Sequence, residues 1–380
     1  MFNLLTLIQI LIGAVGVVDT ITWIVSYKWF NDSLRNLQPP TPGDKTPEKA
    51  LIVTPARNEE ENIEAMINSI RLQDYTSYTH VVVDDASSDA TPRIIRRMME
   101  KDKRIKYLRI EEDEVPRGWS PKIYAIVRGL EEYDDGSYPV LVFLDADIVL
   151  KRRDTLRIMV TRAYTYNAIV SMNPRFKCNT IQCQLMETIL TTLAHTLFGF
   201  HHVKNPQKKT AWFYGCCWTT THEIYTKLGG HKAYHNQLVE DKAIAEQAKR
   251  QGIEIQVIDG VEYVETTWYP TVGETIEALQ RILSPHIAHT TRKRLVLEAT
   301  LLALHYVQPL ITALASTLNP ALAPVAIANY LAQTITHYKA TRLNKHNPLT
   351  SLPTPITGQV VSIALLKSRK HLHWRERTLG

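Results

Sequence analysis

Two acidic pairs in this sequence have the spacing that chemistry on a charged substrate requires. Asp145 and Asp147 stand two residues apart in the apolar run FLDADI. Carboxylates placed this way can hold Mg²⁺ or Mn²⁺ through one or two oxygens, which leaves the other coordination positions to water and a diphosphate. Such an ion neutralises a departing nucleotide diphosphate. Because solvated loop acids often have the same spacing, the interpretation depends on what accompanies the pair.

The second pair, Glu240 and Asp241, directly precedes the helical pattern KAIAEQAKRQ. A carboxylate there predicts a general base that takes a proton from an acceptor hydroxyl. Taken alone, the pair also fits a helix N-cap.

The polar residues that accompany these pairs follow strand-like runs. Strands are predicted over 50–56, 80–87, 105–110 and 139–150, with helical patterns over 59–73 and 90–102. This alternation predicts an α/β domain with a largely parallel sheet, in which ligands bind beyond the carboxyl ends of the strands. The candidate residues fall at those ends: Arg57, Asn58 and Glu59, then Asp84 and Asp85, then Asp145 and Asp147.

Charge and cysteine content narrow the class of protein. The 380 residues hold 44 Lys and Arg against 38 Asp and Glu, and the basic residues cluster beside apolar stretches rather than among stacking aromatics. That placement favours an anionic membrane surface over nucleic acid. The four cysteines show no paired CxxC spacing of a zinc site, so reduced thiols in a cytosolic domain are expected.

Apolar segments at both ends predict membrane helices. Residues 2–27 are long enough to span a bilayer and are followed by basic residues, which predicts an uncleaved anchor with its N-terminus outside. Asp19 is costly at that depth, so either it pairs within a helix bundle or the true span is shorter. Residues 295–338, divided at Asn319, predict two spanning helices, and 355–366 is expected to lie in the interface before a basic tail.

These segments divide the chain into an anchor (1–28), a linker (29–49), the catalytic domain (50–269), an interfacial amphipathic segment (270–294), two transmembrane helices (295–338) and an interfacial, basic cytosolic tail (339–380). The predicted protein is therefore a multi-pass integral membrane protein. Its catalytic domain is expected on the cytosolic side.

The motifs PARNEEEN, VVVDDASSDAT, GWSPKIYAIVRG, FLDADI, GG and VED occur in the order typical of one enzyme family. In this respect the chain resembles the membrane-bound branch of glycosyltransferase family 2, including ceramide glucosyltransferase-like and hopanoid-biosynthesis-type enzymes. The resemblance is closest over residues 50–269 and looser at the terminal HWRERT. It implies a GT-A fold, a nucleotide diphosphate sugar donor, an inverting single displacement and a divalent ion.

The resemblance also assigns roles to individual residues, all by their numbers here. It implies that Pro55, Arg57, Glu59, Asp84, Asp85, Lys122 and Asp145 line the nucleotide-sugar pocket, that Asp147 binds the metal, and that Asp241, paired with Glu240, is the catalytic base. Pro121 stands where the family pattern has glycine, which stiffens the loop before Lys122.

One departure from the family pattern bears on the acceptor. Polymer-forming members carry Gln-x-x-Arg-Trp after the base, and here the nearest stretch, 280–284, lacks the Arg-Trp end. Transfer of one sugar to a membrane lipid is therefore favoured over processive synthesis. Two alternatives remain: a polyprenyl-phosphate sugar synthase or other GT-A-like nucleotide-sugar enzyme, whose phosphate acceptor has less need of a base, and a non-catalytic membrane scaffold.

Overall fold

The protein is described from a computed structural model that covers residues 4–367, 372–374 and 377–379. The chain forms two compact units. The sheet unit comprises residues 37–176, 202–267, 372–374 and 377–379, and the helical unit comprises residues 4–36, 177–201 and 268–367. Each unit is described by itself.

The sheet unit is built on a seven-stranded sheet of order β3-β2-β1-β4-β8-β6-β9. Neighbouring strands are parallel except where β8 pairs with β4 and β6, which confirms the largely parallel α/β fold. The strands are β1 (Ala50–Ala56), β2 (Tyr78–Asp85), β3 (Ile105–Ile110), β4 (Val140–Leu144), β6 (Ile169–Asn173), β8 (Cys217–Thr221) and β9 (Ile255–Asp259).

Two short sheets complete this unit. One has the order β5-β10-β7 (Val149–Leu150, Val264–Thr267 and Arg175–Lys177), and the other pairs β11 (Leu372–Trp374) with β12 (Arg377–Leu379). The predicted strand over 139–150 is thus two strands, β4 and β5, because the chain turns at Asp145, whose carbonyl accepts a bond from the Ile148 amide at 3.2 Å. This turn takes Asp145 and Asp147 out of the sheet, while Phe143 and Leu144 remain in β4.

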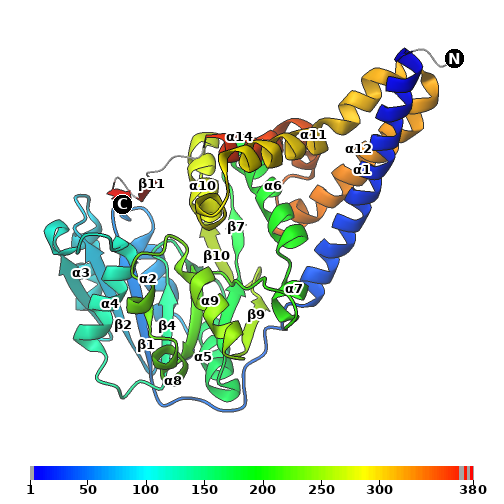
Figure 1. Cartoon of the computed structure of the whole chain (residues 1–380). Coiled ribbons are helices and arrows are strands. Elements are labelled where there is room, and N and C mark those ends of the chain that lie inside the picture. The colour runs from blue at the N-terminus through cyan, green and yellow to red at the C-terminus, as the bar shows by residue number, and fades with distance from the viewer. Residues whose placement is uncertain (1–3, 368–371, 375–376, 380) are drawn as a thin grey trace. The chain divides into compact units, whose positions relative to one another are not determined.

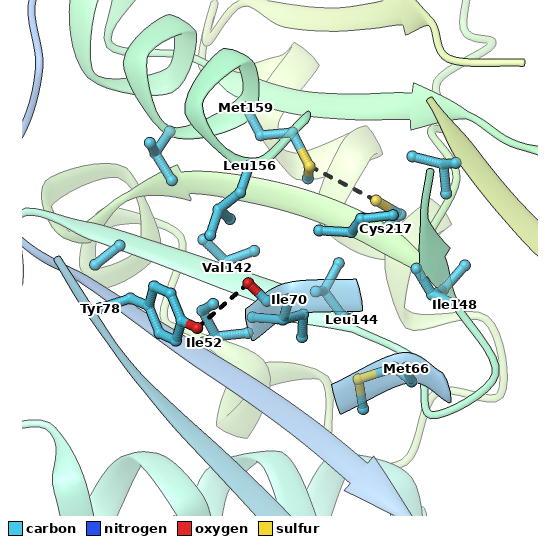
Figure 2. Close-up of a cluster of buried hydrophobic side chains, with 14 of the residues drawn as sticks. Ile52, Met66, Ile70, Tyr78, Val142, Leu144, Ile148, Leu156, Met159 and Cys217 are labelled. Atoms are coloured by element: carbon cyan, nitrogen blue, oxygen red, sulfur yellow. Dashed lines mark hydrogen bonds between the residues drawn. The ribbon is translucent and has the colours of Figure 1, made fainter. Parts of the chain in front are cut away.

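Helices cover both faces of the seven-stranded sheet, because alternate strand residues point to opposite sides. On one side, strand residues pack against apolar residues of α2 (Ile63–Arg71) and α5 (Thr155–Tyr166) (Figure 2): Ile52, Val82, Val142, Met66, Ile70, Leu156 and Met159. On the other side α4 (Pro121–Tyr133) lies so close that a Cβ on Gly129 would come within 2.7 Å of Val83. Each fully buried aliphatic side chain contributes about 1.5–3 kcal/mol.

The helices of the sheet unit lie between these strands in the sequence. They are α2 (Ile63–Arg71), α3 (Thr91–Lys101), α4 (Pro121–Tyr133), α5 (Thr155–Tyr166), α8 (His222–Lys227) and α9 (Glu240–Arg250), and α7 (Phe200–Lys204) lies at the boundary of the two units. The helices predicted over 59–73 and 90–102 correspond to α2 and α3, with α2 shorter than its pattern.

The helical unit contains α1 (Leu4–Arg35), α6 (Ile181–Leu197), α10 (Val272–Ala288), α11 (Arg292–Ser316), α12 (Ala323–Leu343), α13 (Thr354–Thr357) and α14 (Gln359–Leu366). Helices α1, α11 and α12 lie side by side (Figure 1). Gly13 and Gly16 let α1 approach the start of α12 closely. A Cβ on Gly13 would lie 2.8 Å from Leu322, and a Cβ on Gly16 would lie 2.9 Å from Val325. Among the described residues, α1 and α11 are long and apolar enough to cross a membrane.

Asp19 lies buried in this bundle and is paired there, which is the first of the two outcomes expected from the sequence. Its carboxylate contacts Nδ1 of His305 and accepts a hydrogen bond from Nδ2 of Asn329 at 3.1 Å. Both partners are polar groups on the neighbouring helices α11 and α12, so the cost of burying the carboxylate is offset inside the bundle.

The expectation of reduced thiols is wrong for two of the four cysteines. Cys178 and Cys183 form a disulfide, with their Cα atoms 5.3 Å apart. The bridge closes the turn before α6, where the Thr180 side chain accepts a hydrogen bond from the Cys183 amide and caps the helix. Cys216 and Cys217 are free. Of the predicted basic tail, residues 368–371, 375–376 and 380 lie outside the described residues, as does part of HWRERT.

Candidate active site

The carboxyl ends of β1 and β2 bring the first two polar clusters together. The register pairs Ala56 with Asp84, so Arg57 follows β1 beside Asp85. The buried Arg57 guanidinium donates through Nη1 to the Asp85 carbonyl at 2.9 Å and lies 3.8 Å from its carboxylate. Pro55 is the next-to-last residue of β1. The predicted neighbours are therefore adjacent in space.

Loop conformation fixes the residues after β1. Asn58 has a positive φ of 50°, and its main-chain N–H donates to the Ser87 hydroxyl at 3.0 Å. Glu59 is buried, its amide donates to the Thr91 hydroxyl at 2.8 Å, and its carboxylate accepts from Nδ2 of Asn62 at 2.8 Å. The loops after β1 and β2 thus hold each other, which orients Glu59.

Asp84 is fully buried, and protein donors bond both of its carboxylate oxygens. Oδ1 accepts from the Ser87 amide at 3.0 Å, and Oδ2 accepts from the Tyr107 hydroxyl and the Arg109 guanidinium, each at 2.8 Å. These contacts favour a role in shaping the loop. Burial together with the bond to Asp84 raises the pKa of Tyr107 to about 12, so this hydroxyl remains a donor at neutral pH.

Lys122 links two parts of the site that are far apart in the sequence. Its Nζ lies 3.0 Å from the carboxylate of Asp145, after β4, and 3.0 Å from that of Glu240, at the start of α9. Burial opposes the lysine charge, but these two carboxylates outweigh burial and raise the pKa of Lys122 well above its usual value. Lys122 is the second residue of α4, which follows the N-cap Ser120, whose amide donates to the His235 carbonyl at 2.7 Å.

Asp147 lies among other carboxylates. Its Oδ2 accepts a hydrogen bond from the Thr266 hydroxyl at 3.0 Å. Burial, with the nearby charges of Asp145 and Glu59, raises the pKa of Asp147 to about 7. Three acids around one site carry negative charge that a cation relieves, which fits a divalent ion.

The metal site predicted at Asp147 is not a cage of protein ligands. Within the part of the chain that the structure describes, no group of three or more His, Cys, Asp or Glu side chains is arranged to hold a metal ion. The donors present fit an ion that takes one or two carboxylates and completes its shell with water and phosphate oxygens, as Mg²⁺ does in phosphate-bearing sites.

Asp241 and Glu240 occupy the first turn of α9, after Val239 at the N-cap. Oδ2 of Asp241 accepts from the Gly215 amide at 3.1 Å, and Oδ1 accepts from the Lys242 amide at 2.7 Å. A Cβ on Gly215 would come within 2.7 Å of the Asp241 carboxylate, so a larger residue here must displace that carboxylate. Neither acid caps the helix as the simpler interpretation required.

The two adjacent acids differ in their protonation. Burial and the charge of Glu240 raise the pKa of Asp241 to about 7. Burial acts in the same direction on Glu240, but Lys122 outweighs it and lowers the pKa of Glu240. Glu240 therefore stays ionised beside the lysine, while Asp241 can exchange a proton near neutral pH.

The structure brings together most of the residues that the sequence singled out. The clusters at β1 and β2 are adjacent, and Lys122 joins Asp145 to Glu240. Sequence reasoning missed Thr266 and the contact of Gly215 with Asp241, although the glycine was visible in the run YGCC. Thr266 carried no signal, because it lies in a short strand after a stretch without motifs.

The family model described as "Glycosyl transferase family 2" matches residues 51–229. The 4,4'-diaponeurosporenoate glycosyltransferase of Staphylococcus aureus (strain USA300) is 22% identical over 245 residues, which cover 63% of this chain and 61% of that protein. The aligned part is thus less than two thirds of the relative's own length. The solved structure of mannosyltransferase PcManGT from Pyrobaculum calidifontis, in complex with GDP-Man and Mn²⁺, has a TM-score of 0.55 and 21% identity over 97% of this chain and 100% of that chain. At this identity the likeness shows the GT-A fold.

Proposed function

We propose that the whole chain, whose residues 51–229 match the model of glycosyltransferase family 2, moves one sugar from a nucleotide diphosphate donor to a membrane lipid by inverting, metal-dependent displacement. The observation that carries the proposal is the geometry around Lys122. This lysine ties Asp145, which follows β4, to Glu240, which begins α9, and the acid next to Glu240, Asp241, has a pKa near neutrality.

The donor would lie along the carboxyl ends of β1, β2 and β4. Pro55, Arg57, Glu59 and Asp85 would line the nucleotide part, with Asp84 supporting their loop. Asp145 and Lys122 would meet the sugar and phosphate. A lysine already held by two carboxylates can keep those contacts while it meets a phosphate oxygen, because its ammonium has three donors.

Asp147 would hold the divalent ion, and Thr266 would fix the carboxylate that reaches it. A bound Mg²⁺ or Mn²⁺ would supply charge neutralisation for the departing nucleotide diphosphate. The fold relative from Pyrobaculum calidifontis was solved with GDP-Man and Mn²⁺, which supports this assignment.

Asp241 would act as the base. As the acceptor oxygen forms its bond to the anomeric carbon, the hydroxyl proton passes to the Asp241 carboxylate, and the bonding pair of the sugar–phosphate bond leaves with the nucleotide diphosphate. Attack opposite the leaving group inverts the anomeric centre. Gly215 would leave room for this carboxylate and orient it through the main-chain amide.

A lipid acceptor is proposed on two grounds. Helices α1 and α11 have the length and apolarity to cross a membrane, and the Staphylococcus aureus relative is by its name a glycosyltransferase for diaponeurosporenoate. We extend this to a multi-pass protein with the catalytic domain on the cytosolic side, since Arg292, Lys293 and Arg294 form the first turn of α11.

The test is lipid labelling. Detergent-solubilised protein and a total lipid extract are incubated with a panel of radiolabelled nucleotide sugars, with Mn²⁺, with Mg²⁺ or with a chelator. Asp241→Asn and Asp147→Ala are compared with Asp135→Asn, which changes an exposed carboxylate outside the site. We expect metal-dependent label in the lipid fraction, lost in the first two variants and kept in the third.

Two other results would contradict the proposal. Label that appears only on a polyprenyl phosphate and survives in Asp241→Asn would favour a synthase whose acceptor needs no base. Failure of the wild-type protein to bind or use any nucleotide sugar would favour a scaffold.

A further inference from the structure

The helical unit contains a groove between α11 and the α13–α14 segment, with a volume of about 390 Å³. One wall comes from α11 and the other from α13 and α14. The lining residues are Ala299, Thr300, Ala303, Leu304, Val307, Pro355, Ile356, Gln359, Ser362 and Leu366. Because Ala299, Ala303 and Val307 recur at intervals of four, they form one stripe of α11, and the groove follows the helix axis.

The dimensions of the groove limit what can occupy it. From Ala299 to Val307 the helix rises about 12 Å. Dividing the volume by that length gives a cross-section of about 32 Å². An α-helix with its side chains is about 10 Å across, or about 80 Å² in section. A single hydrocarbon chain therefore fits within the groove, whereas a helix of another protein would enter it with only part of its section.

The walls of the groove are mostly apolar and offer a ligand one polar group without a protein partner. The Thr300 hydroxyl donates to the Val296 carbonyl, and the Gln359 amide donates to the carbonyls of Ala303 and Pro355. These polar groups are thus satisfied by the protein. By contrast Ser362 is only 4% exposed, and its hydroxyl has no hydrogen-bond partner among the described residues.

The surroundings of the groove are lipid-compatible. It opens on α11, one of the two helices that are long and apolar enough to span a membrane. Large apolar side chains that line it are exposed, namely Leu304, Ile356 and Leu366. An exposed apolar surface of this kind is stable when hydrocarbon covers it.

We propose that this groove binds one hydrocarbon chain of the lipid acceptor, with an oxygen of that lipid bonded to the Ser362 hydroxyl. This rests on the proposed function for the identity of the lipid. Binding in the groove is nevertheless measurable without sugar transfer, because it depends only on residues of the helical unit.

The experiment uses full-length protein in detergent and a long-chain alcohol that carries a diazirine in its chain. After irradiation, peptides from 299–307 and 355–366 are analysed for adducts. Ala303→Phe fills the groove, and Leu314→Phe is the matched control, since Leu314 is 73% exposed on the same helix and does not line the groove. We expect saturable labelling that falls about tenfold in Ala303→Phe and is unchanged in Leu314→Phe.

Two further readouts distinguish failure of the groove from failure of the proposed function. Ser362→Ala is expected to weaken labelling by the alcohol about fivefold while labelling by the corresponding alkane is unchanged. In Ala303→Phe, the KM for the lipid should rise about tenfold with nucleotide-sugar binding intact.

Three results would overturn the inference: labelling that does not saturate, labelling that bulk phospholipid reduces as strongly as the acceptor extract does, or equal labelling of the two phenylalanine variants. Saturable labelling without any sugar transfer would leave lipid binding standing and reject the proposed reaction.

Discussion

Removing the charge of Lys122 should destabilise the sheet unit far more than removing an exposed charge at the same distance from its partner. In Lys122→Met, the carboxylates of Asp145 and Glu240 lose the cation that lies 3.0 Å from each. Breaking a buried ion pair by deleting one partner costs about 3–5 kcal/mol, because the remaining charge is left uncompensated. The lysine side chain is 19% exposed, so the lower figure, about 3 kcal/mol, is expected.

Arg157 provides the control. It also lies 3.0 Å from a carboxylate, that of Asp74, but the two side chains are 40% and 38% exposed. Exposed pairs contribute about 0.2–1 kcal/mol. The comparison of Lys122→Met with Arg157→Met therefore holds the cation–carboxylate distance constant, while the burial and the number of carboxylate partners differ.

The assay is thermal and denaturant unfolding of the detergent-solubilised protein, with Glu240→Gln added to complete a double-mutant cycle. For a unit of this size, about 3 kcal/mol lowers Tm by about 6–12 °C. Adding Glu240→Gln to Lys122→Met should restore about 2 kcal/mol, since one stranded charge is gone. Equal losses of stability in Lys122→Met and Arg157→Met would show that burial does not strengthen the ion pairs of Lys122. Additive effects of Lys122→Met and Glu240→Gln on stability would show that these two residues are not energetically coupled.

Three further predictions follow from the contacts of single residues. The rate of transfer should rise with pH through about 7 and then level off, because the raised pKa of Asp241 leaves its carboxyl protonated below that value. A rate that is flat between about pH 5 and about pH 9 would exclude Asp241 as the base. Because the pKa of Asp241 is raised in the folded state, its ionised carboxyl destabilises the fold above about pH 7. Asp241→Asn should therefore unfold at a higher temperature than wild type above that pH, and the difference in Tm should shrink toward about pH 4. Gly215→Ala should lower kcat about 100-fold with little change in Tm, because the new Cβ displaces the Asp241 carboxylate; unchanged kcat would count against Asp241. Gly358→Ala should cost about 1–3 kcal/mol or more, since a Cβ there would lie 2.0 Å from the Tyr306 ring, whereas Gly273→Ala, with only a 3.9 Å contact, should be nearly neutral in the same unfolding assay.

The centre of the sheet could be predicted because its strands are continuous apolar runs. ALIVTPA coincides with β1, which is buried along its whole length, as such a composition indicates. IKYLRI coincides with β3 at the edge of the sheet, where only the first and last residues of the strand are buried. Helices also form on both sides of Asn319, where two spanning helices were predicted, because the proline after it ends the preceding helix. Of these two described helices, α11 is long and apolar enough to cross a membrane, and α12 is not.

Pairings between distant segments could not be predicted. The disulfide requires the turn at Thr180, which brings two cysteines with an uninformative spacing within bridging distance. Helix α6 lies in the helical unit although its sequence falls inside the catalytic span, because its apolar residues Met186 and Ile189 pack with Trp23 and Tyr306. Amphipathic spacing shows that a helix has a buried face without showing which segment covers it.

The adjacent acids at the end of β2 show the same limit within the site. From the sequence, Asp84 and Asp85 are equivalent candidates for the nucleotide pocket. Successive strand residues point to opposite faces, so only one of the two can take donors from the neighbouring strand on a given side. The register of β2 with β3 sets Asp84 opposite Arg109, and that arginine, with Tyr107, satisfies Asp84 inside the protein. Asp85 instead lies beside Arg57, which directs the search for the nucleotide-binding acid to Asp85.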